Sequence, residues 1–589
     1  MNSLSVEQKA AVEEKGKVIL SACPGSGKTY TVAQRLSQMI QEWQYQHCGI
    51  AVLSFTNVAH EEISRQLEKM GNASISPYPH FLGTIDHFVN SWIFLPFGHK
   101  VMGCKNRPSI VGLNNNIWHP DSYEWAWREQ ECNKSCKLIN FTYDITGKLI
   151  NNDSKNKNND CPLKMKRCSE LKAKFCKEGY ANQSDANYWA MRILEIYPLV
   201  AKSLAKRFPA LIIDEAQDTS DIQMRIIEIL VSNGLSEVLI VGDPDQAIYE
   251  WREANPKIFV DKTKDTNWTP KYLTENRRSS QHICNATKAF AFHLPKISTA
   301  VGDSAGFSEL PKIIKYNSNS ISSLKNQFVK LCEKFSIEIS PQNIAILVRG
   351  NTTLRRVLGL DDKDINPWKE DNIAKLLAQA VLYRDTKDIK LAMKYLNSVV
   401  SKICFGSYNL SEAEIENQLH GCMSIDKWKI GLWGLLKQLP DSNEELGIWI
   451  KNTENILNEW FKINNWPALE ECSFTSEIYG YKIINGKRES GYLKEPLKTF
   501  VTKASYCDDI TVETIHAAKG KTYEAVMFIV TKQGKCTINQ LATLPNDDEE
   551  IRIAYVAMTR PRKLLVVAVP DSTKPIQLKK FPEEYWHYI

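Results

Sequence analysis

The sequence predicts an α/β protein with two parallel-sheet domains, each interrupted by a long insertion. Runs rich in Val, Ile and Leu fall into two groups, at residues 17–22, 50–56, 210–216 and 237–243, and at residues 343–350, 525–530 and 564–570. Such nearly continuous apolar runs are typical of parallel strands buried on both faces. Helical stretches lie between them, as in repeated strand–helix units. The long segments 91–187 and 366–500 interrupt the two groups, which indicates inserted domains.

The composition is that of an ordinary globular chain. Its 589 residues are enough for several domains with sizeable cores. No apolar run approaches the roughly 20 residues that cross a bilayer, and the first residues lack the apolar stretch of a signal peptide. We therefore expect a cytoplasmic protein with no membrane partner. The 15 cysteines are scattered, and we expect them to stay reduced.

The net charge of +6 comes from one segment. Residues 132–178 carry eleven Lys and Arg against five Asp and Glu, and subtracting these from the totals of 74 and 68 leaves 63 of each elsewhere. The segment includes an Asn-rich polar run that indicates a loop. A basic segment in an otherwise neutral protein is typical of contact with a nucleic-acid backbone. The alternative is a loop on the surface that contacts only solvent.

The second long segment reads as mostly helical. Between residues 372 and 384, apolar side chains follow the i, i+3, i+4, i+7 pattern at Ile373, Leu376, Leu377, Ala380 and Val381. The segment also holds six tryptophans, Trp368, Trp428, Trp433, Trp449, Trp460 and Trp466. We expect most of these rings to lie in a hydrophobic core, and we assign none of them to base stacking.

Residues 17–32 predict a phosphate-binding loop between a strand and a helix. The apolar run leads into SACPGSGKT and then into a stretch with helical periodicity. Lys28 would reach the β- and γ-phosphates of a nucleoside triphosphate, and Thr29 would place its hydroxyl on Mg²⁺. Backbone N–H groups of the loop and of the helix N-terminus would cradle the phosphate oxygens. The general pattern begins with Gly, where this chain has Ala22.

Asp214 and Glu215 supply the acidic half of such a site. They follow four apolar residues; an Asp there can hold Mg²⁺, and the adjacent Glu can deprotonate the attacking water. Taken alone, two acids after a strand could also cap a helix. Arginine-bearing stretches at 273–283 and 553–567 could add positive charge in the transition state, which would make hydrolysis depend on domain closure. Surface arginines are the alternative.

Together these motifs resemble those of the superfamily 1 DNA helicases of the UvrD/PcrA/Rep type. They follow the order of that family through both α/β regions, and the family also commonly has Ala at the first position of the loop. The resemblance implies two RecA-like motor domains, each with a largely helical insertion. The implied boundaries are 1–90 and 188–272 for the N-terminal RecA-like ATPase domain, 91–187 for the basic insertion domain, 273–365 and 501–589 for the C-terminal RecA-like domain, and 366–500 for the helical insertion domain.

The resemblance also implies a set of residues around ATP and Mg²⁺. The catalytic set is Glu215, Gln246, Arg278 and Arg560, in which Gln246 monitors the γ-phosphate and the arginines act as fingers. The expected metal ligands are Thr29 and Asp214. The expected nucleotide-binding set is Gln8, Ala22, Pro24, Gly25, Ser26, Gly27, Lys28, Thr29, Tyr30 and Arg277. Gln217 and Asp218 complete the acidic motif DEAQDTS.

A further set is expected to face single-stranded DNA: Thr56, Asn57, Thr84, His87, Tyr249, Trp251, Arg252, Thr514 and His516. Trp251 is the best candidate for a base-stacking platform, a contact worth about 1–3 kcal/mol per base. Lys519 is expected near DNA or at the interface of the motor domains. The family's insertions can both contact duplex DNA, which adds weight to a DNA contact by the basic segment.

The chain departs from the family around the base and the sugar. Arg277 stands where the family usually has Tyr, and Tyr30 stands where it usually has Arg. Our hypothesis is that the aromatic ring and the guanidinium have exchanged sides of the adenine. Thr522 replaces the family's ribose-contacting Glu, so the sugar selectivity of the site stays open.

The first insertion also holds five cysteines, Cys132, Cys136, Cys161, Cys168 and Cys176. Ligation of a metal or an iron–sulfur cluster is one interpretation, although the spacing matches no zinc pattern.

The resemblance implies an ATP-dependent DNA translocase or helicase that moves 3′ to 5′ on single-stranded DNA and opens duplexes at junctions, in DNA repair or anti-phage defence. The direction comes wholly from the resemblance. One alternative is a regulatory ATPase subunit that senses DNA or nucleotide and controls a nuclease encoded nearby. Helicases of this shape occur beside nucleases in anti-phage systems such as Gabija. An RNA helicase is a third interpretation.

Overall fold

The computed structural model of the chain describes residues 4–55, 57–70, 78–111, 138–151, 166–249, 254–293, 297–317, 320–358, 367–368, 373–407, 410, 412–419, 423–469, 471–474, 483–484, 487–488, 491–501, 505–507 and 510–589. These residues form two compact units. The first is drawn from Met1–Val111, His119–Asp361 and Ala504–Ile589 and contains both large sheets. The second is drawn mainly from Asp362–Lys503 and is largely helical.

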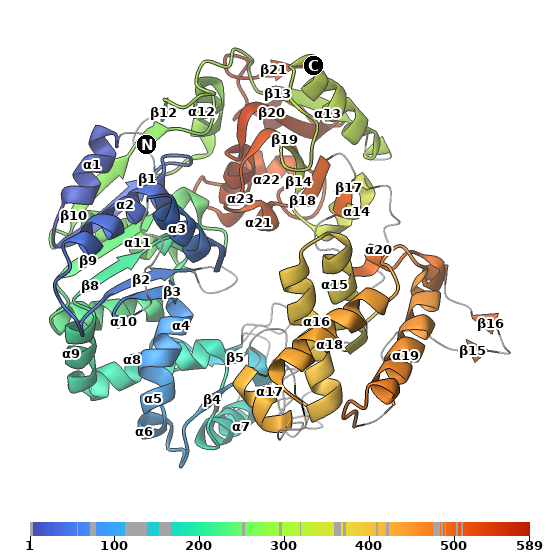
Figure 1. Ribbon diagram of the computed structural model, residues 1–589. Helices are drawn as coiled ribbons and strands as arrows, with labels where there is room; N and C mark the ends of the chain where they lie inside the picture. The colour runs from blue at the N-terminus through green and yellow to red at the C-terminus, as the bar shows by residue number, and fades with distance from the viewer. Residues whose placement is uncertain are drawn as a thin grey trace. The chain divides into compact units, whose positions relative to one another are not determined.

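The first large sheet has six parallel strands in the order β10-β1-β9-β8-β2-β3 (Figure 1). They are β1 (Lys17–Ala22), β2 (Ile50–Ser54), β3 (Phe81–Thr84), β8 (Ala210–Ile213), β9 (Glu237–Gly242) and β10 (Thr269–Leu273). The four apolar runs predicted as parallel strands are the four central ones, which confirms that prediction. The two edge strands, β3 and β10, have no continuous apolar run and are not predicted from the sequence.

Helices cover both faces of this sheet. Val18 and Leu20 of β1 share a core with Val32 and Leu36 of one helix, whereas the alternate residue Ile19 points to the opposite face and is equally buried. The helices around the sheet are α1 (Val6–Glu13), α2 (Lys28–Gln41), α3 (Asn57–Lys69), α8 (Gln183–Ile196), α9 (Pro198–Arg207), α10 (Asp221–Ser232) and α11 (Pro256–Lys264).

The second large sheet has seven strands in the order β17-β18-β14-β19-β20-β13-β21, and only the β17–β18 pair is antiparallel. The strands are β13 (Lys312–Tyr316), β14 (Ile344–Val348), β17 (Ser505–Cys507), β18 (Ile510–Thr514), β19 (Tyr523–Ile529), β20 (Pro561–Pro570) and β21 (His587–Tyr588). Its helices include α12 (Gln281–Thr287), α13 (Ser323–Lys334), α14 (Asn351–Val357), α21 (Ile515–Ala518), α22 (Ile538–Thr543) and α23 (Glu549–Met558).

Alternate residues along the strands of this sheet point to opposite faces and pack into two separate hydrophobic cores. Leu347 and Phe528 pack with residues of α21 and α23, whereas Ile346 and Met527 pack with residues of α13. A central strand of such a sheet must be apolar at every position because both of its faces are buried. The two sheets therefore give an α/β architecture with two RecA-like domains, as predicted.

Short elements lead into the first insertion and continue through the described part of it. They are α4 (Ile85–Val89), a π-helical turn (Asn90–Phe94), α5 (Leu95–Phe97), α6 (His99–Met102), β4 (Ser109–Ile110), β5 (Phe141–Tyr143), β6 (Leu149–Asn151), α7 (Lys166–Lys177) and β7 (Tyr180–Ala181). In α7, Lys172 is fully buried, and its Nζ lies 2.6 Å from Oδ2 of Asp185, which is also fully buried. The same carboxylate accepts the N–H of Asn182 and so fixes the start of α8. One of the basic residues of this segment is therefore part of its core.

Replacing Lys172 by Met is expected to destabilise the protein by about 3–5 kcal/mol, because the carboxylate of Asp185 would stay buried without its counter-charge. Urea unfolding followed by tryptophan fluorescence measures this loss. Lys174→Met, at an exposed position of the same helix, is the matched control and should behave like the unchanged protein. A single Lys172→Met variant as stable as this control would contradict the argument.

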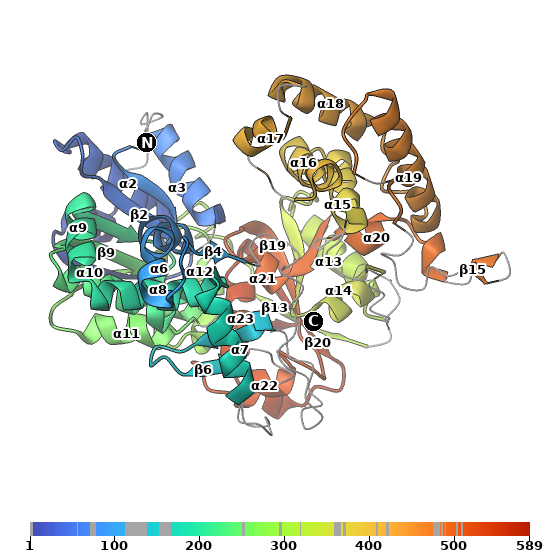
Figure 2. The ribbon, with the colours of Figure 1, turned by 90° about the horizontal axis from the view of Figure 1, so that it is seen from below.

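The second unit is built mainly from helices, α15 (Ile373–Asp385), α16 (Ile389–Phe405), α17 (Glu412–Leu419), α18 (Ile425–Gln438), α19 (Leu446–Ile463) and α20 (Lys498–Val501). Figures 1 and 2 show α15 and α16 side by side, with α18 beside α16. The pattern that predicts a helix near residues 372–384 matches α15, and the prediction that most tryptophans are core is also confirmed. Trp433 is the exception, because 37% of it is exposed and Lys437 lies over its ring.

Within the described ranges, no helix combines the length and the apolarity that crossing a membrane requires. The described residues also contain no group of three or more His, Cys, Asp or Glu side chains that could hold a metal ion. Cys132, Cys136 and Cys161 lie outside the described residues, so the metal interpretation of the five cysteines is untested there. Cys176 is described and buried, and burial followed by the charge of Asp185 raises the pKa of its thiol to about 12.

Candidate nucleotide-binding site

The loop between β1 and α2 forms a backbone cradle. Gly25 and Gly27 have φ angles of 73° and 80°, which L side chains rarely adopt. A Cβ at Gly25 would lie 2.6 Å from Cβ of Arg278 and 2.6 Å from Oδ1 of Asn276, so a side chain there would also collide with the second motor domain. The first turn of α2 has no side-chain cap. The N-cap residue is Gly27, which has no side chain to accept these N–H groups, and a helix N-terminus of this kind suits an anion.

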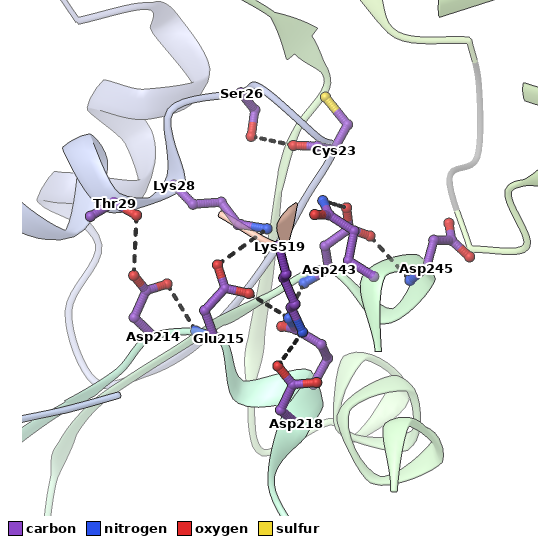
Figure 3. A network of polar contacts seen from close by, with 12 residues as sticks. Cys23, Ser26, Lys28, Thr29, Asp214, Glu215, Asp218, Asp243, Asp245 and Lys519 are labelled. Atoms are coloured by element: carbon purple, nitrogen blue, oxygen red, sulfur yellow. Dashed lines mark hydrogen bonds and ion pairs between the residues drawn. The ribbon is translucent and has the colours of Figure 1, made fainter. Parts of the chain in front are cut away.

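Lys28 and Thr29 lie opposite the acidic pair (Figure 3). Oγ1 of Thr29 donates a 3.3 Å hydrogen bond to Oδ2 of Asp214, and Nζ of Lys28 lies 4.0 Å from Oε1 of Glu215. β1 and β8 lie on either side of β9, so the loop after β1 and the acids after β8 share the carboxyl edge of the sheet. A hydroxyl beside a carboxylate fits Mg²⁺, which prefers oxygen ligands, and the uncapped helix end fits the phosphates of ATP.

The two acids differ in their electrostatic environment. Burial, followed by the charge of Glu215, raises the pKa of Asp214 to about 7. Burial also tends to raise the pKa of Glu215, but the charges of Lys28 and Lys519 outweigh it and lower that pKa to about 2. Glu215 is therefore ionised at neutral pH, as a general base must be. Its φ of 55° turns it sharply away from the strand that precedes it.

A chain of side-chain hydrogen bonds runs from Glu215 to the second motor domain. Nε2 of Gln217 donates to Oε2 of Glu215, and Oε1 of Gln217 accepts the N–H of Asp243 at 3.0 Å. Nε2 of Gln246 donates to Oδ2 of Asp243, and Oε1 of Gln246 accepts from Nη2 of Arg560 at 2.6 Å. Arg560 is 1% exposed. The structure therefore brings Glu215, Gln246 and Arg560 together, although they are far apart in sequence.

Arg278, the other predicted finger, lies next to the loop. Its N–H donates to Oδ1 of Asn276, and its Nη1 donates to the carbonyl oxygen of Thr559 at 3.0 Å. Burial, followed by the charges of Arg560 and Arg562, lowers the pKa of Arg278 to about 9, so the side chain stays charged at neutral pH. The partly buried guanidinium of Arg278 and the buried guanidinium of Arg560 thus approach the ATP site from the second domain, where an anion would relieve their mutual repulsion.

Lys519 joins the acidic motif to two residues of the predicted DNA set. Its Nζ lies 2.5 Å from Oδ2 of Asp218 and 4.5 Å from the centre of the Tyr249 ring. Nε2 of His516 is 3.2 Å from the carbonyl oxygen of Ile248, and the His516 ring makes an edge contact with Tyr249. Burial, followed by the charge of Arg349, lowers the pKa of His516 to about 4, so this ring is neutral at physiological pH.

Among the described residues, two other members of the predicted DNA set cap helices. Thr84 caps the N-terminus of α4 by accepting the N–H of His87, and Thr514 caps α21 in the same way by accepting the N–H of Ala517. Asn57 is the first residue of α3, and its side chain is not described. Thr56, Trp251 and Arg252 lie outside the described residues, so the proposed stacking platform is untested.

The residues predicted around the base lie on both sides of the loop. Nε2 of Gln8 donates to the carbonyl oxygen of Ser26 at 3.0 Å, and the N–H of Arg277 donates to the carbonyl oxygen of Gly25 at 2.9 Å. The guanidinium of Arg277 pairs with Glu275, and the hydroxyl of Tyr30 accepts from Gln34. Ala22 is the last residue of β1; Pro24 follows it within the loop, and Thr522 lies in the turn before β19.

Three polar residues in or near the nucleotide site, Asn276, Asp243 and Glu513, are not predicted from the sequence. Oδ1 of Asn276 accepts the N–H groups of both Arg278 and Ser279, and Asp243 links Gln217 to Gln246. Glu513 is fully buried and accepts from Nζ of Lys521 at 2.6 Å and from the hydroxyl of Tyr523. Asp243 could have been predicted as a site residue because, like Asp214, it directly follows a predicted strand. Asn276 and Glu513 become recognisable only once the chain is folded.

The fold and this site define a phosphate-loop protein with two RecA-like domains. Residues 4–267 match the UvrD/REP helicase N-terminal domain, and residues 489–572 match the UvrD-like helicase C-terminal domain. Together the two matches cover more than half of the chain. The chain belongs to the UvrD/Rep family of superfamily 1 helicases.

Curated relatives align over nearly the whole chain. The ATP-dependent DNA helicase Rep of Buchnera aphidicola subsp. Acyrthosiphon pisum (strain APS) is 24% identical, with 96% of this chain and 94% of the relative covered. DNA helicase II of Rickettsia typhi is 23% identical, with 98% and 93% covered. The ATP-dependent DNA helicase PcrA of Leuconostoc citreum is 22% identical, with 96% and 81% covered.

Proposed function

We propose that this protein is an ATP-dependent DNA helicase that moves 3′ to 5′ on single-stranded DNA and separates duplexes. The family assignment supports helicase activity, and relatives named as ATP-dependent DNA helicases support ATP and DNA as its substrates. The observation that carries the proposal is the hydrogen bond from Arg560 to Gln246, which joins the second motor domain to the ATP site of the first. ATP binding and hydrolysis then bias the contact between the two motor domains.

The contacts around the phosphate loop support a role for each residue in ATP binding and hydrolysis. Lys28 and the N–H groups at the start of α2 bind the β- and γ-phosphates, and Thr29 and Asp214 provide oxygen ligands for Mg²⁺. Bound Mg²⁺ supplies positive charge to the phosphate oxygens. Glu215 accepts the proton of the attacking water.

The two guanidinium groups supply the remaining positive charge. Arg278 and Arg560 stabilise the negative charge that develops on the transferred phosphoryl group. Gln246, which is held by Asp243 and Arg560, is placed to detect whether that group is present.

Lys519 is the proposed link between hydrolysis and the DNA strand. It pairs with Asp218 of the acidic motif and lies over the ring of Tyr249. When the phosphate charge is lost, the electrostatic potential around Asp218 changes. Lys519, which pairs with Asp218, then shifts relative to Tyr249 and His516. Both rings belong to the set that the resemblance places on DNA.

The hypothesis that Tyr30 and Arg277 have exchanged sides of the adenine can be tested through the affinity for ATP. If the Tyr30 ring stacks on adenine, Tyr30→Ala should raise KM for ATP about fivefold or more and leave kcat nearly unchanged, because one base–aromatic stack is worth about 1–3 kcal/mol. Steady-state ATPase kinetics measure the two constants separately. Tyr45→Ala, at an exposed tyrosine outside the loop, is the control. An unaltered KM in Tyr30→Ala would refute the exchange.

The ATPase rate with and without nucleic acid tests the proposed substrate class. We expect single-stranded DNA to stimulate hydrolysis strongly, and RNA of the same sequence to stimulate it much less. Equal stimulation by RNA would favour an RNA helicase instead. Stimulation by DNA without any strand separation would favour a regulatory ATPase that acts on a partner nuclease.

A further inference from the structure

Glu513 places a carboxylate in the core of the second motor domain. It lies on β18 beside Leu347 of β14, on the face of the sheet that packs with residues of α21 and α23. Its side chain is 0% exposed. Burying a charge costs free energy unless partners compensate it, and an apolar side chain of similar size would fill the same space without that cost. Packing alone therefore does not account for a carboxylate at this position.

The two carboxylate oxygens of Glu513 accept hydrogen bonds from both sides of Thr522. Nζ of Lys521 donates to Oε2 at 2.6 Å, and the hydroxyl of Tyr523 donates to Oε1. Lys521 precedes β19, and Tyr523 is the first residue of that strand. Glu513 thus ties the end of β18 to the start of β19 and closes residues 514–522 into a loop, which we call the 514–522 segment.

The 514–522 segment contacts one of the two proposed arginine fingers. The carbonyl oxygen of Lys521 accepts a long hydrogen bond of 3.4 Å from Nη1 of Arg560, and the N–H of Tyr523 donates to the carbonyl oxygen of Arg560 at 3.2 Å. Nη2 of the same guanidinium donates to Gln246 at 2.6 Å. The position of the Lys521 carbonyl therefore helps to set how the guanidinium meets Gln246.

Packing gives the turn after α21 little support. Gly520 has a φ of 86°, and a Cβ built there would have no heavy atom of the described chain within 4 Å apart from its immediate neighbours. Gly520 and Lys521 are both exposed. The two side-chain contacts with Glu513 are thus the expected restraint on the backbone of Lys521.

We propose that Glu513 is a positioning residue for Arg560: its carboxylate holds the 514–522 segment so that the carbonyl of Lys521 orients the guanidinium toward Gln246. Glu513 acts through this segment rather than on the nucleotide. The inference rests on the proposed function, because the role of Arg560 in hydrolysis belongs to it. It adds a residue that none of the predicted sets contains.

Glu513→Gln tests the role, because it removes the charge and keeps the size of the side chain. We expect kcat for ATP hydrolysis without DNA to fall about 10- to 100-fold, since a displacement of about 1 Å can cost about 10²-fold in rate. The dissociation constant for a nucleotide should change little. Glu524→Gln is the control, because it removes an acid of β19 that pairs with Arg562 and Lys563 instead.

Tyr523→Phe is the second variant, in case Glu513→Gln does not fold. It removes only the hydroxyl that donates to Glu513, so we expect a smaller loss of kcat in the same direction. Urea unfolding of each variant measures its stability separately from its rate. A lower urea midpoint with a normal kcat in both variants would make Glu513 a residue of the core alone and overturn the inference.

A double-mutant cycle with Arg560→Ala, measured in single turnovers, shows through which residue Glu513 acts. If Glu513 acts through Arg560, adding Glu513→Gln to Arg560→Ala should lower kcat little further. Fully additive losses would overturn the inference while leaving the role of Arg560 intact. A normal kcat in Arg560→Ala, or no hydrolysis by the unchanged protein, would instead refute the proposed function, and this inference with it.

Discussion

Arg560→Ala is expected to lower kcat for ATP hydrolysis by about 10³-fold or more. The Arg560 side chain is 1% exposed, and its Nη2 donates to Gln246 beside the phosphate loop. Arginine fingers contribute about 10³–10⁵ in kcat because they neutralise charge that develops only in the transition state. The loss should therefore appear in kcat, whereas the dissociation constant for a nucleotide should change little.

Single-turnover hydrolysis and equilibrium binding of a fluorescent ATP analogue measure these two quantities. Arg560→Lys keeps the charge but loses the planar donor geometry, so it should recover only a small part of the rate. Arg562→Ala, two residues away and partly exposed, is the control and should hydrolyse ATP at nearly the normal rate. A kcat for Arg560→Ala within tenfold of the unchanged protein would show that Arg560 only holds the domains together.

Glu215→Gln is expected to lower kcat by about 10²–10⁴-fold, the usual contribution of a positioned general base. Lys28 and Lys519 lower the pKa of Glu215 against the opposite effect of burial, so this side chain is a carboxylate at neutral pH, the form that a proton acceptor needs. The amide of Gln cannot do so, although its oxygen can still accept the hydrogen bond from Gln217. Folding and nucleotide affinity should thus be preserved.

Hydrolysis in a single turnover, with nucleotide affinity measured in parallel, tests this role. Glu178→Gln, an exposed acid in the first insertion, serves as the matched control. A Glu215→Gln variant that binds ATP normally and hydrolyses it at the usual rate would assign the base to another residue. Weakened binding with a normal kcat would instead indicate that Glu215 mainly holds Lys28.

The central strands of both sheets could be predicted because their burial dictates their composition. Each of β1, β2, β8 and β9 is covered on both faces, so nearly every position is apolar and the run is visible in the sequence. The edge strand β10 has a Pro at its second position, and its first four side chains alternate between partly exposed and exposed. β3 is short and contains a Gly. Such strands owe their conformation to a neighbour rather than to their own sequence.

Residues for a candidate nucleotide site could be nominated from the sequence because their chemistry concentrates in short motifs next to strand ends. Lys28, Thr29, Asp214 and Glu215 each follow a predicted strand, and the structure places them together. Asn276 and Glu513 act through contacts that only the folded chain creates. The sequence likewise could not show that Lys172, in the most basic segment, is a core residue, because its partner Asp185 lies on a different helix.

Strand displacement on matched duplexes with either a 3′ or a 5′ single-stranded tail tests the proposed helicase activity and its direction. We expect ATP to drive displacement only from the 3′ tail. We also expect Lys28→Ala to abolish this displacement, because the loop then lacks the side chain that reaches the phosphates. Displacement from the 5′ tail would contradict the proposed direction. Strong DNA-stimulated hydrolysis without displacement from either tail would contradict the helicase itself and favour a regulatory ATPase.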